Sequence, residues 1–142
     1  MAYTTQYVTP KVLLYPSTTS IYAYLPDQVT NSTSTYVEAK RFTITTLIIG
    51  NSKVTMEYDH RVNNNAGSSW AKVKVGDTWL TEYENSTDVW TTRTHSNVDL
   101  TGLQIGDTIS LWQRENTGTH VSGVKEFKIL ATESTMWGED NP

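Results

Sequence analysis

The chain of 142 residues contains no cysteine, which excludes both a disulfide framework and a thiolate metal site. A domain of this length can bury enough apolar surface to fold without such cross-links. Charged residues make up 18% of the sequence, below the roughly 25% that is usual for globular domains. Threonine, serine and asparagine supply the polarity instead, which predicts a neutral, hydrogen-bonding surface.

Basic residues are few and long apolar runs are missing. The 11 Lys and Arg face 15 Asp and Glu, for a net charge of −4, and no basic stripe is found, so we expect no nucleic-acid partner. Apolar runs such as the one at 47–49 are far too short to span a bilayer, and no basic amphipathic helix is present, so we expect no membrane partner. The first residues lack the features of a signal peptide, which predicts synthesis in a cytoplasm.

Beyond residue 35, apolar and polar residues alternate with the period of two that is typical of half-buried β-strands. The alternation is clearest at 54–59 and at 70–75. The expected strands are 36–44, 54–59, 70–75, 79–81, 89–92, 98–100, 108–112 and 121–130. Turns rich in Gly and Asn separate them, and no segment carries an apolar stripe long enough for a helix. Short strands at this spacing predict an all-β fold, a sandwich or a barrel.

Residues 1–35 have a different composition, with three of the four prolines and no glycine, yet many aromatic residues. A disordered tail would be poor in aromatics. Two interpretations remain open: an edge strand packed on its own domain, or an extended N-terminal arm that reaches a neighbouring subunit. We therefore divide the chain into an arm or edge segment (1–35), a β-sandwich domain (36–131) and a C-terminal tail (132–142). The candidate interface residues are Tyr3, Tyr7, Leu13, Leu14, Tyr15, Tyr22, Tyr24 and Trp137.

Motifs for catalysis are not found. His60, His95 and His120 each stand alone near a predicted strand end, without a second ligand at metal-binding spacing. A G-x-S-x-G nucleophile turn and a phosphate-binding glycine loop are both missing from the sequence. We therefore expect no catalytic residues and no cofactor.

Acidic residues offer two weaker possibilities. Pairs of carboxylates on one strand face could serve a glycosidase, although they are also typical of the solvated face of a half-buried strand. These pairs are Glu57 with Asp59 and Glu82 with Glu84. Four aspartates could offer oxygens to calcium, but they form no recognisable calcium loop, and we expect no metal site. They are Asp77, Asp88, Asp99 and Asp107.

Large amphipathic rings are abundant, with five Trp and eight Tyr. Such rings are favoured at interfaces, form stacking platforms for sugars, and also fill cores. Trp112, flanked by apolar neighbours, fits a core position. Sugar binding would need exposed rings beside polar loops, for which Trp79, Tyr83 and Trp90 are the candidates.

Five stretches of the sequence resemble, in order, the strands of a β-sandwich module found in structural proteins of tailed viruses. They are YVEAKRFTI at 36–44, VTMEY at 54–58, WAKVKVG at 70–76, the strand pair at 98–111 and VKEFKI at 124–129. The start of a strand at Gly106-Asp107 is also similar to C1q- and TNF-like jelly rolls, which are trimers. The resemblance covers about two-thirds of the chain and implies a jelly-roll-like antiparallel sandwich.

The same resemblance implies a non-enzymatic viral structural protein. We expect a capsid decoration protein, or a minor capsid or tail protein, that assembles as a homotrimer through its arm and its apolar subunit faces. Its partner would be the major capsid protein or another virion protein, and its location the virion. The alternative is a carbohydrate-binding or receptor-binding module with a glycan as partner. A polysaccharide-cleaving enzyme that uses the paired carboxylates is a third hypothesis.

Overall fold

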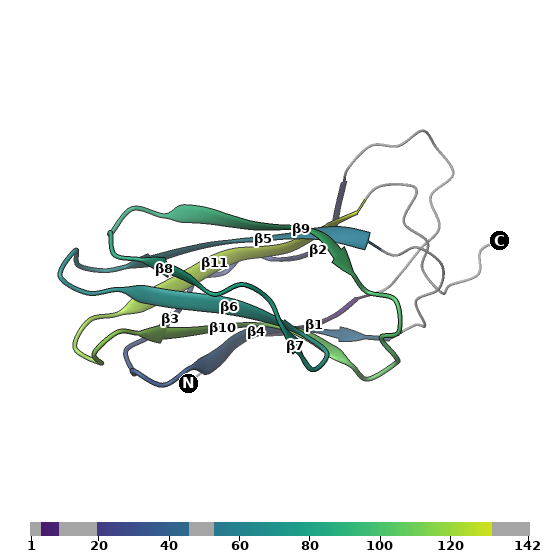
Figure 1. Ribbon diagram of the computed structural model, residues 1–142, viewed down its shortest axis with the longest axis horizontal. Coiled ribbons are helices and arrows are strands. Elements are labelled where there is room, and N and C mark those ends of the chain that lie inside the picture. The colour runs from purple at the N-terminus through teal and green to yellow at the C-terminus, as the bar shows by residue number, and fades with distance from the viewer. Residues whose placement is uncertain (1–3, 9–19, 46–52, 132–142) are drawn as a thin grey trace.

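The computed structural model describes residues 4–8, 20–45 and 53–131. They form two β-sheets packed face to face, and no helix occurs among them (Figure 1). Consequently, none of these segments offers a helix capable of crossing a bilayer. The predicted all-β fold, a jelly-roll-like sandwich built mainly from antiparallel strands, is confirmed.

We call the two layers sheet A and sheet B. Sheet A has the order β1 (Thr4–Val8), β4 (Val37–Ile44), β10 (Thr108–Glu115), β6 (Ser69–Val75) and β7 (Thr78–Trp79), with β8 (Tyr83–Asn85) also paired to β6. Sheet B has the order β2 (Ser20–Leu25), β11 (Ser122–Ala131), β5 (Lys53–Val62) and β9 (Thr91–Asp99), with β3 (Val29–Asn31) also paired to β11.

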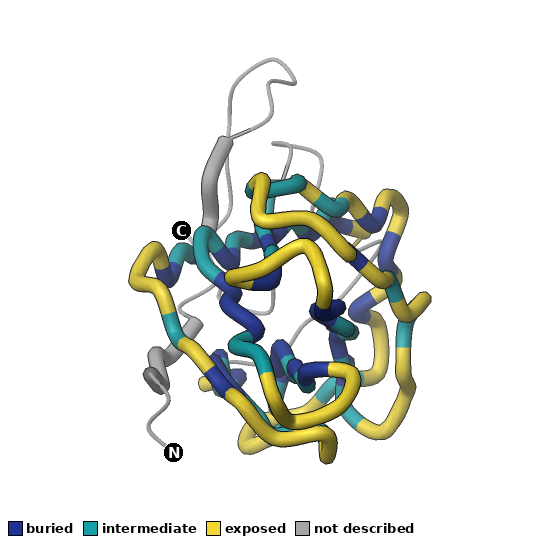
Figure 2. The backbone as a smooth tube through the Cα atoms, turned by 90° about the vertical axis from the view of Figure 1, so that its left-hand side faces the viewer, coloured by how far each residue is buried: buried dark blue, intermediate teal, exposed yellow. Residues whose placement is uncertain are grey.

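The core lies between the sheets because every second residue of the central strands points inward. In β5, for example, burial alternates strictly along the strand, and Met56 and Tyr58 are fully buried. Figure 2 shows the sandwich end-on, with exposed positions concentrated in the loops and buried positions along the strands. Phe42 from sheet A meets Phe127 from sheet B with ring centroids 5.0 Å apart. This packing fixes which face of each sheet looks outward.

The described part of residues 1–35 belongs to the sandwich itself. β1 pairs in parallel with β4 at the edge of sheet A, whereas β2 and β3 both pair with β11 in sheet B. Pairing gives the backbone groups of these strands partners that a free arm would have to find in water or on another subunit. The division at residue 36 therefore does not separate an arm from the sandwich among the described residues, and the interpretation as edge strands accounts for them.

Strand boundaries differ from the expectations at the edges of the sheets. The two strands expected at 89–92 and 98–100 are one continuous strand, β9, with a register shift relative to β5 and a φ of 57° at Asn97. The strand expected at 79–81 ends at Trp79, and β8 was not predicted at all. Short edge strands carry too few residues for a clear alternation, which explains these differences.

Candidate functional site

The outward face of β6 and β10 carries large rings and cations in alternation. In β6, Trp70, Lys72 and Lys74 are partly exposed, and the residues between them are buried. In β10, Trp112 and Arg114 are likewise partly exposed between buried neighbours. The register places Trp112 opposite Lys72 and Arg114 opposite Trp70. Because residues directly opposite in antiparallel strands share a face, each ring has a cation beside it across the strands.

A tight turn adds Trp79 to this face. Gly76, with a φ of 59°, lets the chain reverse after β6, so that Trp79 in β7 lies opposite Lys74. The Trp79 ring packs edge-on against Trp112, with centroids 5.6 Å apart and an interplanar angle of 73°. Trp79 is 42% exposed, more than any other tryptophan among the described residues.

Cations lie over the rings and connect them into a row. The Lys72 amine is 4.1 Å from the centroid of the Trp79 ring and 4.3 Å from that of Tyr36, the residue just before β4. The Arg114 guanidinium carbon lies 5.4 Å from the Tyr36 centroid and 4.9 Å from that of Trp70. These distances are within the range of cation–π attraction. Each of the two cations therefore bridges two rings.

Lys74 extends the row at one end, with its amine 5.3 Å from the Trp79 centroid. We call this surface the aromatic face. Its members are Tyr36, Trp70, Trp79, Trp112, Lys72, Lys74 and Arg114. It runs across the outer side of sheet A from β7 to the start of β4.

Two hydrogen bonds hold rings of the aromatic face in place. The indole N–H of Trp112 donates to Ser110 Oγ at 2.8 Å, and the Tyr36 hydroxyl donates to the Glu82 carboxylate. Burial, followed by the hydrogen bond to Glu82, raises the pKa of Tyr36, so its hydroxyl stays neutral. Trp112 and Tyr36 are thus held in place by hydrogen bonds as well as by packing, which lowers the entropy that a binding event would lose.

Carboxylates next to the aromatic face are already engaged. Glu38 forms a two-pronged ion pair with Arg41 on β4, with contacts of 2.7 and 2.6 Å. Glu82 accepts the hydroxyl of Tyr36. Within the described part of the chain, no carboxylate lies within 4.0 Å of Lys72, Lys74 or Arg114.

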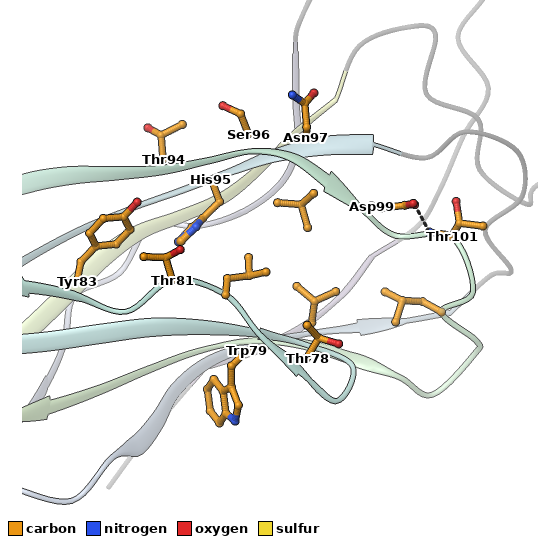
Figure 3. A pocket seen from close by; sticks show the side chains of 14 residues that line it. Thr78, Trp79, Thr81, Tyr83, Thr94, His95, Ser96, Asn97, Asp99 and Thr101 are labelled. Carbon is orange, nitrogen blue, oxygen red and sulfur yellow. Dashed lines mark hydrogen bonds between the residues drawn. The ribbon is translucent and has the colours of Figure 1, made fainter.

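A groove opens elsewhere, at the side of the sandwich where β9 ends sheet B and β7 and β8 end sheet A. It encloses about 740 Å³. Tyr83 and His95 reach between the sheets there, whereas Trp79 points away from them toward the outer side of sheet A (Figure 3). Burial lowers the pKa of His95, and its Nε2 is buried with no hydrogen-bond partner among the described residues. Threonine and serine hydroxyls line the rim.

The predicted interface residues are only partly described. Tyr3, Leu13, Leu14, Tyr15 and Trp137 lie outside the described residues. Tyr7 belongs to β1 and Tyr22 to β2. Tyr24 donates its hydroxyl to Glu126 Oε1 at 2.5 Å within sheet B. Contact of these residues with a partner stays a prediction.

The two predicted pairs of carboxylates lie on different sheets, one pair on each. On sheet B, Asp59 accepts a hydrogen bond from Thr92 at 2.7 Å, and Glu57 accepts one from Thr94 at 3.5 Å. Glu84 belongs to β8 of sheet A, and Glu82 directly precedes that strand. Glu57 and Asp59 are both partly exposed between buried neighbours and therefore share the outer face of β5, as predicted, and each is engaged by a threonine of β9.

Metal-binding side chains do not gather in the described residues: no group of three or more His, Asp or Glu is found there. Of the four aspartates considered for calcium, Asp99 and Asp107 accept backbone N–H groups in their own turns, from Thr101 and Gln104. His60 is buried and hydrogen-bonded. These residues stabilise loops and core.

Of the three rings named for sugar binding, Trp79 and Tyr83 both line the groove, and Trp90 does not. Trp79 is on the aromatic face, and Tyr83 packs against His95 in the groove. Trp90 lies against sheet B, with the Arg61 guanidinium carbon 4.5 Å and the Lys125 amine 4.4 Å from its centroid. The aromatic face as a unit was missed.

Trp112 was expected in the core and is instead half-buried on the outer side of sheet A. The missed signal is a charged residue two positions from a tryptophan, at Trp70-x-Lys72 and Trp112-x-Arg114. In a strand this spacing puts the ring on the same face as the charge, and therefore outward.

Comparison with known proteins finds likeness in fold only. No family model and no curated protein matches the chain. Among solved structures, the insecticidal delta-endotoxin Cry8Ea1 from Bacillus thuringiensis matches with a TM-score of 0.52 at 13% identity, over 72% of this chain. The match spans 19% of the toxin chain, less than two-thirds of its length. At this identity the likeness shows the sandwich fold alone.

Two further structures match below a TM-score of 0.5, both at 13% identity. One is the CBM36-1 domain of a multidomain xylanase from the hindgut metagenome of Trinervitermes trinervoides, with a TM-score of 0.43 over 74% of this chain and 71% of that one. The other is a carbohydrate-binding module CBM36 in complex with calcium and xylotriose, with a TM-score of 0.40 over 75% and 98%. Likenesses this distant leave the function to be argued from the surface itself.

Proposed function

We propose that the protein binds glycans through the aromatic face of sheet A. The observation that carries the proposal is the connected row of four rings on one outward sheet face: Tyr36, Trp70, Trp79 and Trp112. Rings that served only the core would point between the sheets, as Phe42 and Phe127 do.

Sugars and aromatic rings match chemically. A pyranose ring has a face of C–H groups that stacks on an aromatic ring, while its hydroxyls need hydrogen-bond partners at the edge. On the aromatic face, the Lys72 amine and the Arg114 guanidinium lie over the rings and can donate hydrogen bonds to sugar hydroxyls beside them. Trp79, as the most exposed of the tryptophans described, would make the first contact.

A polymer suits the face better than a single sugar. A single sugar covers the apolar surface of one ring, which contributes little against the several kcal/mol of freedom that association costs. One ring would therefore hold a ligand weakly. A chain of sugars that crosses several strands can contact several rings at once.

Binding without catalysis is part of the proposal. The carboxylates beside the aromatic face, Glu38 and Glu82, are engaged by Arg41 and Tyr36 and are not placed to transfer protons to a bound glycan. The virion role implied by the sequence resemblance is compatible with glycan binding, because glycans coat host cells. That role, the homotrimer, the capsid partner and the virion location stay predictions.

Affinity electrophoresis against a panel of neutral and acidic polysaccharides tests the proposal. We expect the wild-type chain to be retarded by at least one of them, and Trp79→Ala to lose at least about tenfold in affinity, which corresponds to about 1.4 kcal/mol. Trp90→Ala is the matched control, since Trp90 also lies between two cations but on sheet B. Near-ultraviolet circular dichroism would confirm that both variants are folded.

Two results would contradict the proposal. One is that no glycan in the panel retards the wild-type chain. The other is that Trp79→Ala binds as tightly as wild type, because the aromatic face would then not be the contact surface.

A further inference from the structure

The aromatic face is positively charged, although the chain as a whole is not. Lys72, Lys74 and Arg114 belong to it, and the described residues bring no carboxylate within 4.0 Å of any of them. The next cation along sheet A, Arg41, is already paired with Glu38. The three cations stand in a chain whose net charge is −4, so their gathering on one face is not a consequence of composition.

We infer that the glycan is an acidic polysaccharide, with carboxylate or sulfate groups that lie between the rings against Lys72, Lys74 and Arg114. The inference rests on the proposed function and narrows its ligand class. The inference follows from charge complementarity. An anionic ligand would neutralise Lys72, Lys74 and Arg114, which the carboxylates of the described residues do not pair with.

The spacing of the cations fits a repeating anionic polymer. Lys72 and Lys74 are two residues apart on β6, and Arg114 comes from the neighbouring strand. Each cation shares a ring with the next: Lys74 and Lys72 both contact Trp79, and Lys72 and Arg114 both contact Tyr36. Sugar rings and their acidic groups would alternate in the same way. Arg114 can hold a carboxylate or sulfate through two parallel hydrogen bonds.

A single-stranded nucleic acid has the same general chemistry, anionic groups beside stacking rings. The overall charge of −4 favours the glycan, because a net negative domain repels a dense polyphosphate over distances longer than the local contacts. An acidic polysaccharide carries its charge less densely. We therefore commit to the glycan and make nucleic acid an outcome of the test.

The experiment measures affinity for hyaluronan, alginate, polygalacturonate and chondroitin sulfate, each beside its carboxyl-reduced or desulfated form. An oligodeoxythymidylate is included as a further arm, and a chelator removes divalent ions. We expect binding to at least one acidic polymer, at least about tenfold weaker binding to its neutral form, and a several-fold loss when NaCl rises from about 0.05 to about 0.5 M.

Variants assign the effect to the aromatic face. The triple variant Lys72→Gln, Lys74→Gln, Arg114→Gln should bind the acidic polymer about tenfold more weakly. A second triple variant, Lys72→Arg, Lys74→Arg, Arg114→Lys, keeps the charge and should stay within about threefold of wild type. This second variant separates loss of charge from disturbance of the rings on which the cations lie. Lys125→Gln, which removes a cation over Trp90 on sheet B, is the control and should change affinity less than about twofold.

The outcomes test two separate claims, namely that the protein binds glycans and that the bound glycan is acidic. Equal or tighter binding of the neutral forms overturns the acidic ligand and leaves glycan binding intact. Binding of the oligodeoxythymidylate alone overturns both in favour of nucleic acid. If none of these polymers binds, the acidic ligand is overturned, and glycan binding is overturned with it when the wider panel of polysaccharides also gives no retardation. If the glutamine variant binds the acidic polymer like wild type, the cations of the aromatic face are not its partners.

Discussion

Glu115 is expected to contribute a large, pH-dependent part of the stability of the sandwich. Its side chain is fully buried at the end of β10. Oε1 accepts backbone N–H groups from Thr117 at 2.9 Å, Gly118 at 2.6 Å and Thr119 at 3.1 Å in the loop that leads to β11. Oε2 accepts the N–H of Ser68 at 3.3 Å. One carboxylate thus ties the loop after β10 to the residue before β6.

The charge of this carboxylate is what makes the contacts strong. Burial by itself would raise the pKa of Glu115, but the hydrogen bonds from backbone N–H groups lower it to about 2, from a usual value of 4.5. A folded-state pKa below the unfolded one means that the ionised group stabilises the fold above pH 4.5, and that this stability is lost as the pH falls toward 2. The difference corresponds to about 3 kcal/mol near neutral pH and to about 1.5 kcal/mol at about pH 3.

The test compares urea unfolding of wild type and Glu115→Gln at the two pH values. In the variant, the side-chain amide is uncharged. Its NH₂ group can only donate, so it cannot accept an N–H group from Ser68 or from the loop. We expect a loss of about 3 kcal/mol at about pH 7 and of about half that at about pH 3. Glu57→Gln on the outer side of sheet B is the control and should change stability by less than about 0.5 kcal/mol. An equal loss for Glu115→Gln at both pH values would refute the role of its charge.

Much of the sandwich could be predicted because its signal is local. The period of two in β5 and β6 follows from burial of one face, and that pattern is visible within six or seven residues. The partners of those strands are not visible there. β1 pairs with β4 across more than thirty residues of chain and in parallel, with Thr4 opposite Lys40, and nothing in either segment names the other. The interpretation of residues 1–35 therefore stayed open until the pairing was known.

Lys40 shows where the alternation itself misleads. Ala39 and Lys40 are adjacent and both fully buried, next to a register shift in β10 between Leu111 and Trp112. The Lys40 amine donates to the backbone carbonyl oxygen of Leu25 at 2.9 Å. A bulge changes which residues face inward, and the sequence carries no separate mark for it.

A chain of hydrogen-bonded polar side chains, which runs inward from the partly exposed Arg93, was also beyond prediction, because its members come from several strands. Arg93 Nε donates to His60 Nε2 at 3.0 Å, and His60 Nδ1 lies 3.0 Å from Ser69 Oγ. Ser69 Oγ is 2.8 Å from Ser122 Oγ, which donates to Gln113 Oε1 at 2.8 Å. Since Arg93 can only donate, it fixes the direction of every bond that follows.

The aromatic face was missed for a related reason. Composition counts charges but does not locate them, so a chain with net charge −4 was expected to have no basic surface. Register then placed Arg114 beside Trp70 and Trp112 beside Lys72. The tryptophans were counted correctly, and the pairing that makes them a surface was not predictable from spacing along one strand.

Two further predictions concern the end of the sandwich where these polar groups gather. Gly67→Ala would place a Cβ 2.7 Å from His120 Cδ2 and 2.8 Å from Glu115 Oε2. We therefore expect the free energy of unfolding, measured by thermal unfolding, to fall by about 1–3 kcal/mol. A decrease below about 0.5 kcal/mol would contradict this close packing around Gly67. For His60, burial and then the nearby charge of Arg93 lower the pKa to about 3, so that the ring stays neutral with its proton on Nδ1, donating to Ser69. Imidazole ¹⁵N chemical shifts should show that tautomer unchanged from about pH 7 to about pH 4, whereas an unfolded chain takes up the proton near its usual value of 6.5. Stability from this residue is therefore lost as the pH falls from 6.5 toward 3, and it is lost equally in wild type and in Glu115→Gln. If the His60 ring titrates near its usual value in the folded chain, the stated direction of the hydrogen bonds is wrong, because a protonated Nε2 cannot accept from Arg93.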